Sequence, residues 1–163
     1  MDRRHILSAG ASLLGLLAAS RIAGAAGGDR FEIVKSEADW KAQLSASEYA
    51  ILRGHGTERA FTSPLNKEKR TGRFTCAGCD LALFSSETKF ESGTGWPSFY
   101  APLDNAVATT TDASYGMSRT EVHCRRCGGH LGHVFDDGPR PTGLRYCMNG
   151  VALSFVATEA SRS

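Results

Sequence analysis

The spacing of apolar residues predicts helices near the start of the chain. Between residues 36 and 53 the apolar side chains fall at nearly helical intervals, at Trp40, Leu44, Ile51 and Leu52. Ser36 precedes the first group, and Ser45 or Ser47 precedes the second, where a hydroxyl can cap the first turn of a helix. The pattern therefore predicts two short helices.

The rest of the chain follows a different pattern. Residues 54 to 72 are polar and contain three glycines and one proline, which predicts a long surface connection. Beyond Arg73, eight short runs are rich in β-branched and aromatic residues and are separated by Gly, Pro, Asp and Asn, from RFTCAGC to VALSFVAT. We expect a small, mainly β domain with antiparallel sheets.

The first 25 residues form a segment of another kind. A charged start is followed by an apolar run from Ile6 to Leu17 and by small residues up to Ala25. The run is short for a bilayer span, which needs about 20 residues, so it predicts a cleaved export signal ahead of one domain at residues 26–163. Arg3 and Arg4 resemble the twin-arginine class, which exports folded proteins; the alternative is an ordinary secretory signal. Both place the protein outside the cytoplasm, and we expect the bacterial periplasm.

The charge of the remaining chain argues against one class of partner. Residues 1 to 25 hold three arginines and one aspartate, so the formal charge of +2 falls to zero without them. A nucleic-acid-binding protein needs clustered Lys and Arg to replace the counterions of the phosphates. Here the basic residues are scattered, so we expect no nucleic-acid partner.

Four of the five cysteines form two C-x-x-C pairs with 44 residues between them, Cys76 with Cys79 and Cys124 with Cys127. Each pair can place two sulfurs on one cation, and four thiolates around zinc leave no position for a substrate, so such a zinc would be structural. Disulfides, an iron–sulfur cluster and redox-active pairs are alternatives, although a C-x-x-C disulfide closes only a tiny loop. A zinc ribbon alone would also fit a small binding module.

The fifth cysteine has no such partner. If LRYCMNG is a strand, Arg145, Cys147 and Asn149 share one face, because alternate side chains point the same way. A nearby guanidinium favours the thiolate, which is the nucleophilic form. The alternative is that Cys147 is a small buried hydrophobic residue.

Two histidines precede this segment in a glycine-rich stretch. His130 and His133 are suited to proton transfer near neutral pH. A regular strand would point them to opposite faces, so a shared site requires Gly132 to introduce a bulge or bend. Either histidine could instead be structural.

The segment SGTGWPSFY contains a candidate for the wall of a pocket. Trp96 precedes Pro97 and follows two nearby glycines, which predicts an indole held in a rigid extended turn. Such an indole commonly lines an apolar pocket. The alternative is an anchor in the core.

The segments GWPSF, GHLGHVFDDGP and RYCMN, together with the two C-x-x-C pairs, resemble the B-type methionine-R-sulfoxide reductases over residues 35 to 156. The resemblance implies a mainly β fold of two small antiparallel sheets that form a compact, barrel-like domain behind short N-terminal helices. It also implies one structural zinc ion on four cysteines, Cys76, Cys79, Cys124 and Cys127.

The same resemblance implies roles for the remaining residues. Cys147 would be the nucleophile, and His130, His133 and Asn149 would orient the sulfoxide oxygen and assist its protonation. Trp96 would contact the substrate's methyl group. Arg145 is a further candidate for the substrate site from its place in the chain alone, two residues from the thiol, where its charge can stabilise the thiolate. The substrate would be methionine R-sulfoxide in oxidised proteins, converted to methionine as Cys147 becomes a sulfenic acid. An S-sulfoxide reductase is a narrower alternative.

One position departs from the family pattern. Many members carry a resolving cysteine just before GWPSF, where this chain has Thr94. Three routes could then reduce the sulfenic acid: a thioredoxin-like protein, a zinc cysteine or a small thiol. Use of a zinc cysteine would dismantle the metal site, so we expect direct reduction by an external thiol. We also expect the protein to be a monomer.

Overall fold

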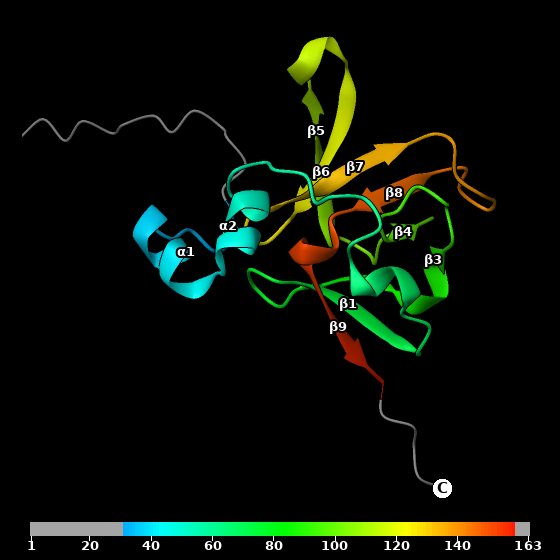
Figure 1. The fold of residues 1–163 in the computed structure, drawn as a ribbon, viewed down its shortest axis with the longest axis horizontal. Coiled ribbons are helices and arrows are strands. Elements are labelled where there is room, and N and C mark those ends of the chain that lie inside the picture. Colours follow the sequence, from blue (N-terminus) through cyan, green and yellow to red (C-terminus); the bar gives the residue numbers. More distant parts are fainter. Residues whose placement is uncertain (1–30, 159–163) are drawn as a thin grey trace, which may run out of the picture. The chain divides into compact units, whose positions relative to one another are not determined.

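Two short helices begin the part of the chain that the structure, a computed structural model, describes, residues 31 to 158 (Figure 1). Helix α1 spans Glu37–Gln43 behind the N-cap Ser36, and α2 spans Ala46–Leu52 behind Ser45, which forms a capping box with Glu48. The predicted pair of helices is confirmed, with Ser45 as the second cap. The predicted export signal, residues 1 to 25, lies outside the described residues.

Two antiparallel sheets follow the helices. The smaller sheet has the order β2-β1-β9, from β1 (Gly72–Cys76), β2 (Ala82–Ser85) and β9 (Leu153–Ala157). The larger sheet has the order β3-β4-β8-β7-β6-β5, and its strands are β3 (Lys89–Phe90), β4 (Ser98–Phe99), β5 (Val107–Asp112), β6 (Arg119–Cys124), β7 (His130–Phe135) and β8 (Arg145–Met148). Short 3-10 turns lie between them, η1 (Pro64–Lys67), η2 (Ser86–Thr88), η3 (Ser114–Gly116) and η4 (Gly150–Ala152).

The two sheets lie in one barrel-like domain but do not close into a barrel. Within residues 31 to 158, strands β2 and β9 end the smaller sheet and β3 and β5 end the larger one, so neither sheet closes on itself. A barrel needs its first and last strands to pair, and β3 has only two residues to offer a partner. The predicted mainly β architecture of two antiparallel sheets is confirmed, and neither sheet is a closed barrel.

The strands agree with the sequence pattern with one addition. Each of the eight runs contains a strand, and β4 is the extra one. Its two residues follow Pro97, which is too short a run to give an alternating pattern. None of the helices in the described part of the chain is long and apolar enough to cross a membrane.

The aromatic core joins the two sheets. Phe84 of β2 stacks on Phe99 of β4 at 4.4 Å between ring centroids, and Phe74 of β1 meets the same ring edge-on at 4.9 Å. All three side chains are fully buried. Burial of rings of this size is a major contribution to stability, so the smaller sheet fixes β4 in place. Strand β4 in turn pairs with β8, which carries Cys147.

Candidate active site and metal centre

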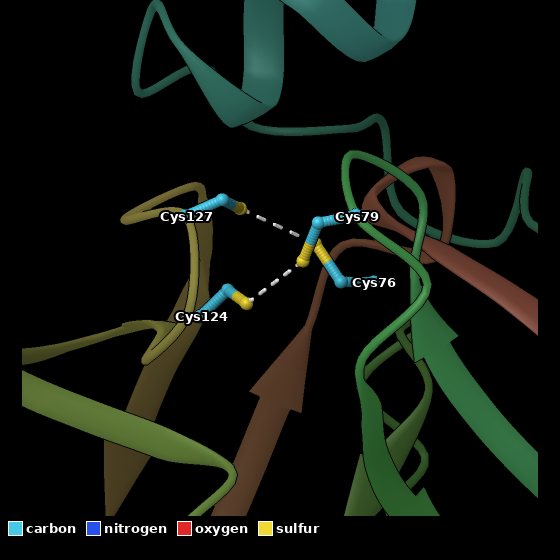
Figure 2. Close-up of side chains that lie close together, drawn as sticks. All are labelled: Cys76, Cys79, Cys124 and Cys127. Carbon is cyan, nitrogen blue, oxygen red and sulfur yellow. Dashed lines mark hydrogen bonds between the residues drawn. The ribbon is translucent and has the colours of Figure 1, made fainter. Parts of the chain in front are cut away.

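The two C-x-x-C pairs meet at one point in the fold (Figure 2). Cys76 ends β1 and Cys79 lies in the turn toward β2, while Cys124 ends β6 and Cys127 lies in the turn toward β7. The sulfurs of Cys76 and Cys127 are 3.7 Å apart, and those of Cys79 and Cys124 are 3.5 Å apart. The centre therefore joins a turn of the smaller sheet to a turn of the larger one.

These distances distinguish a metal site from disulfides. A disulfide requires about 2.05 Å between its sulfurs, and all five cysteines of residues 31 to 158 are free thiols. All four sulfurs of the cluster lie within 4.8 Å of one another, close enough to share one ion. Three of the four cysteines are buried, which is typical of a closed structural site.

Cys147 lies in β8, half-buried, in the wall of a cavity of about 120 Å³. Its neighbours across the sheet are Ser98 of β4 and His133 of β7. The cavity is also lined by Trp96, His133 and Asn149. Cys147 is therefore accessible rather than packed in the core, and four of the residues that the sequence singled out share one cavity.

Two effects act on the Cys147 thiol. Burial raises its pKa above the ordinary value, because a thiolate is poorly solvated there. The hydroxyl of Thr94, 4.0 Å from the sulfur, and the charge of Arg145 act in the opposite direction. Burial outweighs both in the free protein, so the thiol form predominates before a substrate binds.

Arg145 is not part of the cavity wall. Its guanidinium donates two hydrogen bonds to Asp137, at 2.8 and 2.9 Å, and lies over the ring of Phe135 at 4.4 Å from the centroid. Phe135 lines the cavity and Arg145 does not. Arg145 therefore acts on Cys147 through its charge and supports the cavity from behind Phe135.

A β-bulge places both histidines on one side of the larger sheet. Val122 pairs with Gly132, but His123 pairs with His130, which leaves Leu131 as the extra residue on β7. The rings of His130 and His133 therefore lie 5.5 Å apart. The expected bulge exists, with Leu131, next to Gly132, as its extra residue.

Gly132 serves a different purpose. A Cβ at this position would lie 2.1 Å from the carbonyl oxygen of Cys147 and 3.0 Å from the Cα of Met148. The absence of a side chain lets β7 approach β8 closely at the cavity.

Each histidine is held by a carboxylate that the sequence did not single out. The Nδ1 of His130 lies 2.8 Å from Glu121, and the Nε2 of His133 lies 2.8 Å from Asp112. His133 lines the Cys147 cavity, whereas His130 lines a larger neighbouring pocket of about 590 Å³. Glu121 and Asp112 stand 9 and 21 residues from their partners, so no local motif marks the pairs.

The charges of these groups differ. Burial lowers the pKa of His130 despite the nearby Glu121, so its imidazole is neutral at neutral pH. Hydrogen bonds from Ser114 and His133 hold the pKa of Asp112 far below its usual range. Burial opposes ionisation of Glu121, but hydrogen bonds from Thr110 and His130 lower its pKa overall. Both carboxylates are therefore ionised and can stabilise positive charge on the imidazoles.

Glu58 connects two side chains that line the cavity, Trp96 and Asn149. Its backbone oxygen accepts a hydrogen bond from the indole of Trp96 at 2.9 Å, and its backbone N–H donates to the Oδ1 of Asn149 at 2.8 Å. Its carboxylate accepts from the N–H groups of Gly150 at 2.6 Å and Val151 at 3.3 Å. The Nδ2 of Asn149 donates to the Leu131 oxygen at 3.0 Å. Glu58 thus fixes both side chains, although it lies in the polar connection where no sequence pattern marks it.

Comparison with known proteins identifies the family. The model of the SelR domain matches residues 44–157. The chain is 57% identical to the peptide methionine sulfoxide reductase MsrB of Leptospira interrogans over 77% of this chain and 96% of the relative. It is 57% identical to that of Pseudomonas putida strain W619, over 76% and 94%, and 56% identical to that of Methanosarcina mazei, over 78% and 92%. Because the domain covers most of the chain, this protein belongs to the SelR family, together with the MsrB reductases.

Proposed function

We propose that this protein reduces the R epimer of methionine sulfoxide in oxidised proteins to methionine. The observation that carries the proposal is the cavity in which the Cys147 thiol lies among an indole, an imidazole and an amide, from Trp96, His133 and Asn149. A methyl group needs an apolar wall, a sulfoxide oxygen needs hydrogen-bond donors, and its sulfur needs a nucleophile. The match to this chain extends over nearly the whole length of relatives that carry the name peptide methionine sulfoxide reductase.

The reaction balances with the groups present. The thiolate of Cys147 attacks the sulfoxide sulfur and forms a sulfur–sulfur bond while the oxygen is protonated. The S–O bond of the sulfoxide then breaks, the hydroxyl passes to the cysteine sulfur, and the S–S bond breaks, which releases methionine and leaves Cys147 as a sulfenic acid. The cysteine sulfur is oxidised by two electrons and the methionine sulfur is reduced by two. His133 faces the cavity and is the nearer proton source, and Asp112 holds its Nε2 in place. His130 supports it from the adjoining pocket.

The test compares purified variants on separated sulfoxide epimers. We expect wild type to reduce the R epimer of a methionine sulfoxide peptide and Cys147→Ser to lose the activity with its metal retained. Full activity in Cys147→Ser would refute the mechanism, and preference for the S epimer would refute the stereochemistry. If Cys147 can be alkylated but the protein reduces neither epimer, the result would support a binding module instead.

We further propose that the four-cysteine centre holds zinc. Four sulfurs at about 2.3 Å from a tetrahedral zinc ion lie about 3.8 Å apart, close to the observed 3.5 and 3.7 Å. A zinc ion that is fully coordinated by thiolates is structural and gives no chemistry to the reaction. We expect Cys124→Ser to lose zinc and thermal stability, whereas the matched change Cys147→Ser retains one zinc. Equal zinc contents in the two variants would contradict this assignment.

The sulfenic acid is recycled, in our proposal, by an external thiol reductant such as a thioredoxin-like protein. Thr94 stands beside Cys147 and cannot form a disulfide, and the other four cysteines are within reach of one shared metal ion. Oxidation with one equivalent of substrate should give a sulfenic acid that dimedone traps, with zinc retained. A disulfide between Cys147 and a cysteine of the cluster, with zinc released, would refute direct external reduction.

Export is a separate proposal that rests on residues 1 to 25. Their charged start, apolar run and small residues support a cleaved signal, and Arg3 with Arg4 supports the twin-arginine class. We expect the processed protein in the periplasmic fraction of a bacterial host. Replacing both arginines by lysine should retain it in the cytoplasm. Unchanged export of that variant would indicate an ordinary secretory signal.

A further inference from the structure

A pocket of about 590 Å³ adjoins the Cys147 cavity and contains groups that the proposed reaction does not use. Thr57, Arg119 and His133 line both spaces, so the two are continuous at these residues. Among the described residues, the pocket also holds a cluster of metal-ligand type that is separate from the cysteines: His55, Glu121 and His130.

The three side chains converge on one point. The Nδ1 atoms of His130 and His55 lie 2.8 and 3.3 Å from the same Glu121 oxygen, Oε1. One ligand atom from each of the three residues lies within 4.8 Å of the others. Nitrogen and oxygen ligands about 2.0 to 2.2 Å from one ion lie roughly 3 to 3.5 Å apart. The two separations to Glu121, 2.8 and 3.3 Å, already lie close to that range.

Each ligand is held by the fold. Glu121 lies in β6, buried, and the hydroxyl of Thr110 donates to its other oxygen at 2.6 Å. His130 is buried in β7. His55 is exposed and has a φ of 53°, between two glycines whose N–H groups bind carbonyl oxygens of α2, Gly54 to Tyr49 and Gly56 to Ala50. A second hydrogen bond that orients a ligand is usual at metal sites.

We propose that His55, Glu121 and His130 form a second metal site, which takes a divalent transition metal ion. Two imidazoles and one carboxylate suit Zn²⁺, Cu²⁺, Ni²⁺ or Fe²⁺ in preference to Mg²⁺ or Ca²⁺, which select oxygen ligands. Three protein ligands leave coordination positions that open into the pocket. The metal takes the place of the proton between the His130 Nδ1 and Glu121, and that proton moves to Nε2 of the same neutral imidazole.

Occupation of this site inhibits the enzyme. This consequence rests on the proposed function, in which His130 supports His133 in protonating the sulfoxide. The ring centroids of the two histidines are 5.5 Å apart, so an ion on His130 also adds positive charge close to His133. The ion also holds His130 and fills part of the space that adjoins His133 and the Cys147 cavity.

Binding is measured without reference to activity. The full-length protein, with one zinc already in its cysteine centre, is titrated with Zn²⁺ by calorimetry. We expect one further equivalent in wild type and more than about tenfold weaker binding in His55→Gln. Thr111→Val changes another residue of the same pocket wall and should bind as wild type does. Absence of a second equivalent, or equal affinity in His55→Gln, overturns the site.

Two further measurements, the absorption spectrum with Co²⁺ and the reductase activity with Zn²⁺, test the ligands of the site and its link to the reaction. Co²⁺ added to the zinc-loaded protein should give weak visible bands of nitrogen and oxygen ligation; strong sulfur charge-transfer bands would mean exchange at the cysteines and would overturn the proposal. Zn²⁺ should inhibit reduction of the R epimer, with more than about tenfold more metal needed in His55→Gln. Binding without inhibition overturns the link to the reductase, and calorimetry decides the site even if the protein reduces no sulfoxide.

Discussion

The hydroxyl of Thr94 lies 4.0 Å from the sulfur of Cys147. The same hydroxyl lies 2.8 Å from that of Ser92, so its place is fixed by the turn before Trp96. Burial raises the pKa of Cys147, and Thr94 opposes that effect without offering a bond to the oxidised sulfur. In the proposed mechanism, Thr94 therefore favours the Cys147 thiolate but supplies no thiol for internal resolution.

Thr94→Cys should convert the enzyme to internal resolution. After one equivalent of sulfoxide, we expect the introduced thiol to attack the sulfenic acid and form one disulfide with Cys147. Mass spectrometry and thiol titration measure the loss of two thiols, and dimedone labelling should disappear. Thr94→Ser keeps a hydroxyl and should remain labelled by dimedone. A labelled sulfenic acid without disulfide in Thr94→Cys would show that the side chains cannot approach.

The charges behind the cavity should set the pH dependence of Cys147 alkylation. Arg145 lowers the pKa of Cys147 and Asp137 raises it, while burial raises it most. Arg145→Met should therefore move the rate profile of alkylation by iodoacetamide to higher pH, and Asp137→Asn should move it to lower pH. Arg70→Met, a change of an exposed arginine paired with Glu68, should leave the profile unchanged. Shifts of the same sign in both test variants would contradict the assignment.

Local sequence signals were enough for the helices, most strands and the cysteine centre. Ser36 and Ser45 mark helix starts because capping acts within three residues, and each C-x-x-C pair is formed by one turn. The clustering of both pairs could be inferred because a four-ligand ion requires it. Strand β4 was missed because its two residues, Ser98 and Phe99, carry no period.

The support of the site could not be inferred in this way. Glu121, Asp112 and Glu58 act on residues that lie 9, 21 and 91 positions away in the chain, and an isolated carboxylate in a strand or loop has no distinguishing pattern. The bulge at Leu131 depends on the register between β6 and β7, which one strand alone does not reveal. Barrel closure likewise depends on which edge strands pair.

Gly132→Ala should damage the active site more than the fold. The added methyl group would meet the carbonyl oxygen of Cys147 at 2.1 Å, so β7 and β8 must separate where the cavity lies. We expect a loss of about 1–3 kcal/mol in the free energy of unfolding and a fall in kcat/KM. Gly143 has a φ of 73°, and a Cβ added there would meet no atom within 4 Å. Gly143→Ala should therefore lower stability through backbone strain alone and keep its activity. Equal activities of the two variants would contradict the role of close strand approach.

Glu58→Ala should lower activity through the position of Trp96 and Asn149. The carboxylate holds the N–H groups of Gly150 and Val151, and its removal leaves these donors without that acceptor, at a cost of about 1–3 kcal/mol of stability. The Glu58 backbone, which binds the Trp96 indole and the Asn149 amide, would then shift. We expect kcat/KM for the R epimer to fall about ten- to a hundredfold while zinc content is unchanged. Glu87→Ala removes an exposed carboxylate elsewhere and should match wild type. Glu58 makes no contact with the Cys147 thiol, so the alkylation rate of Cys147 should be preserved. A fall in that rate equal to the loss of kcat/KM would show a general collapse of the cavity instead of misplaced substrate contacts.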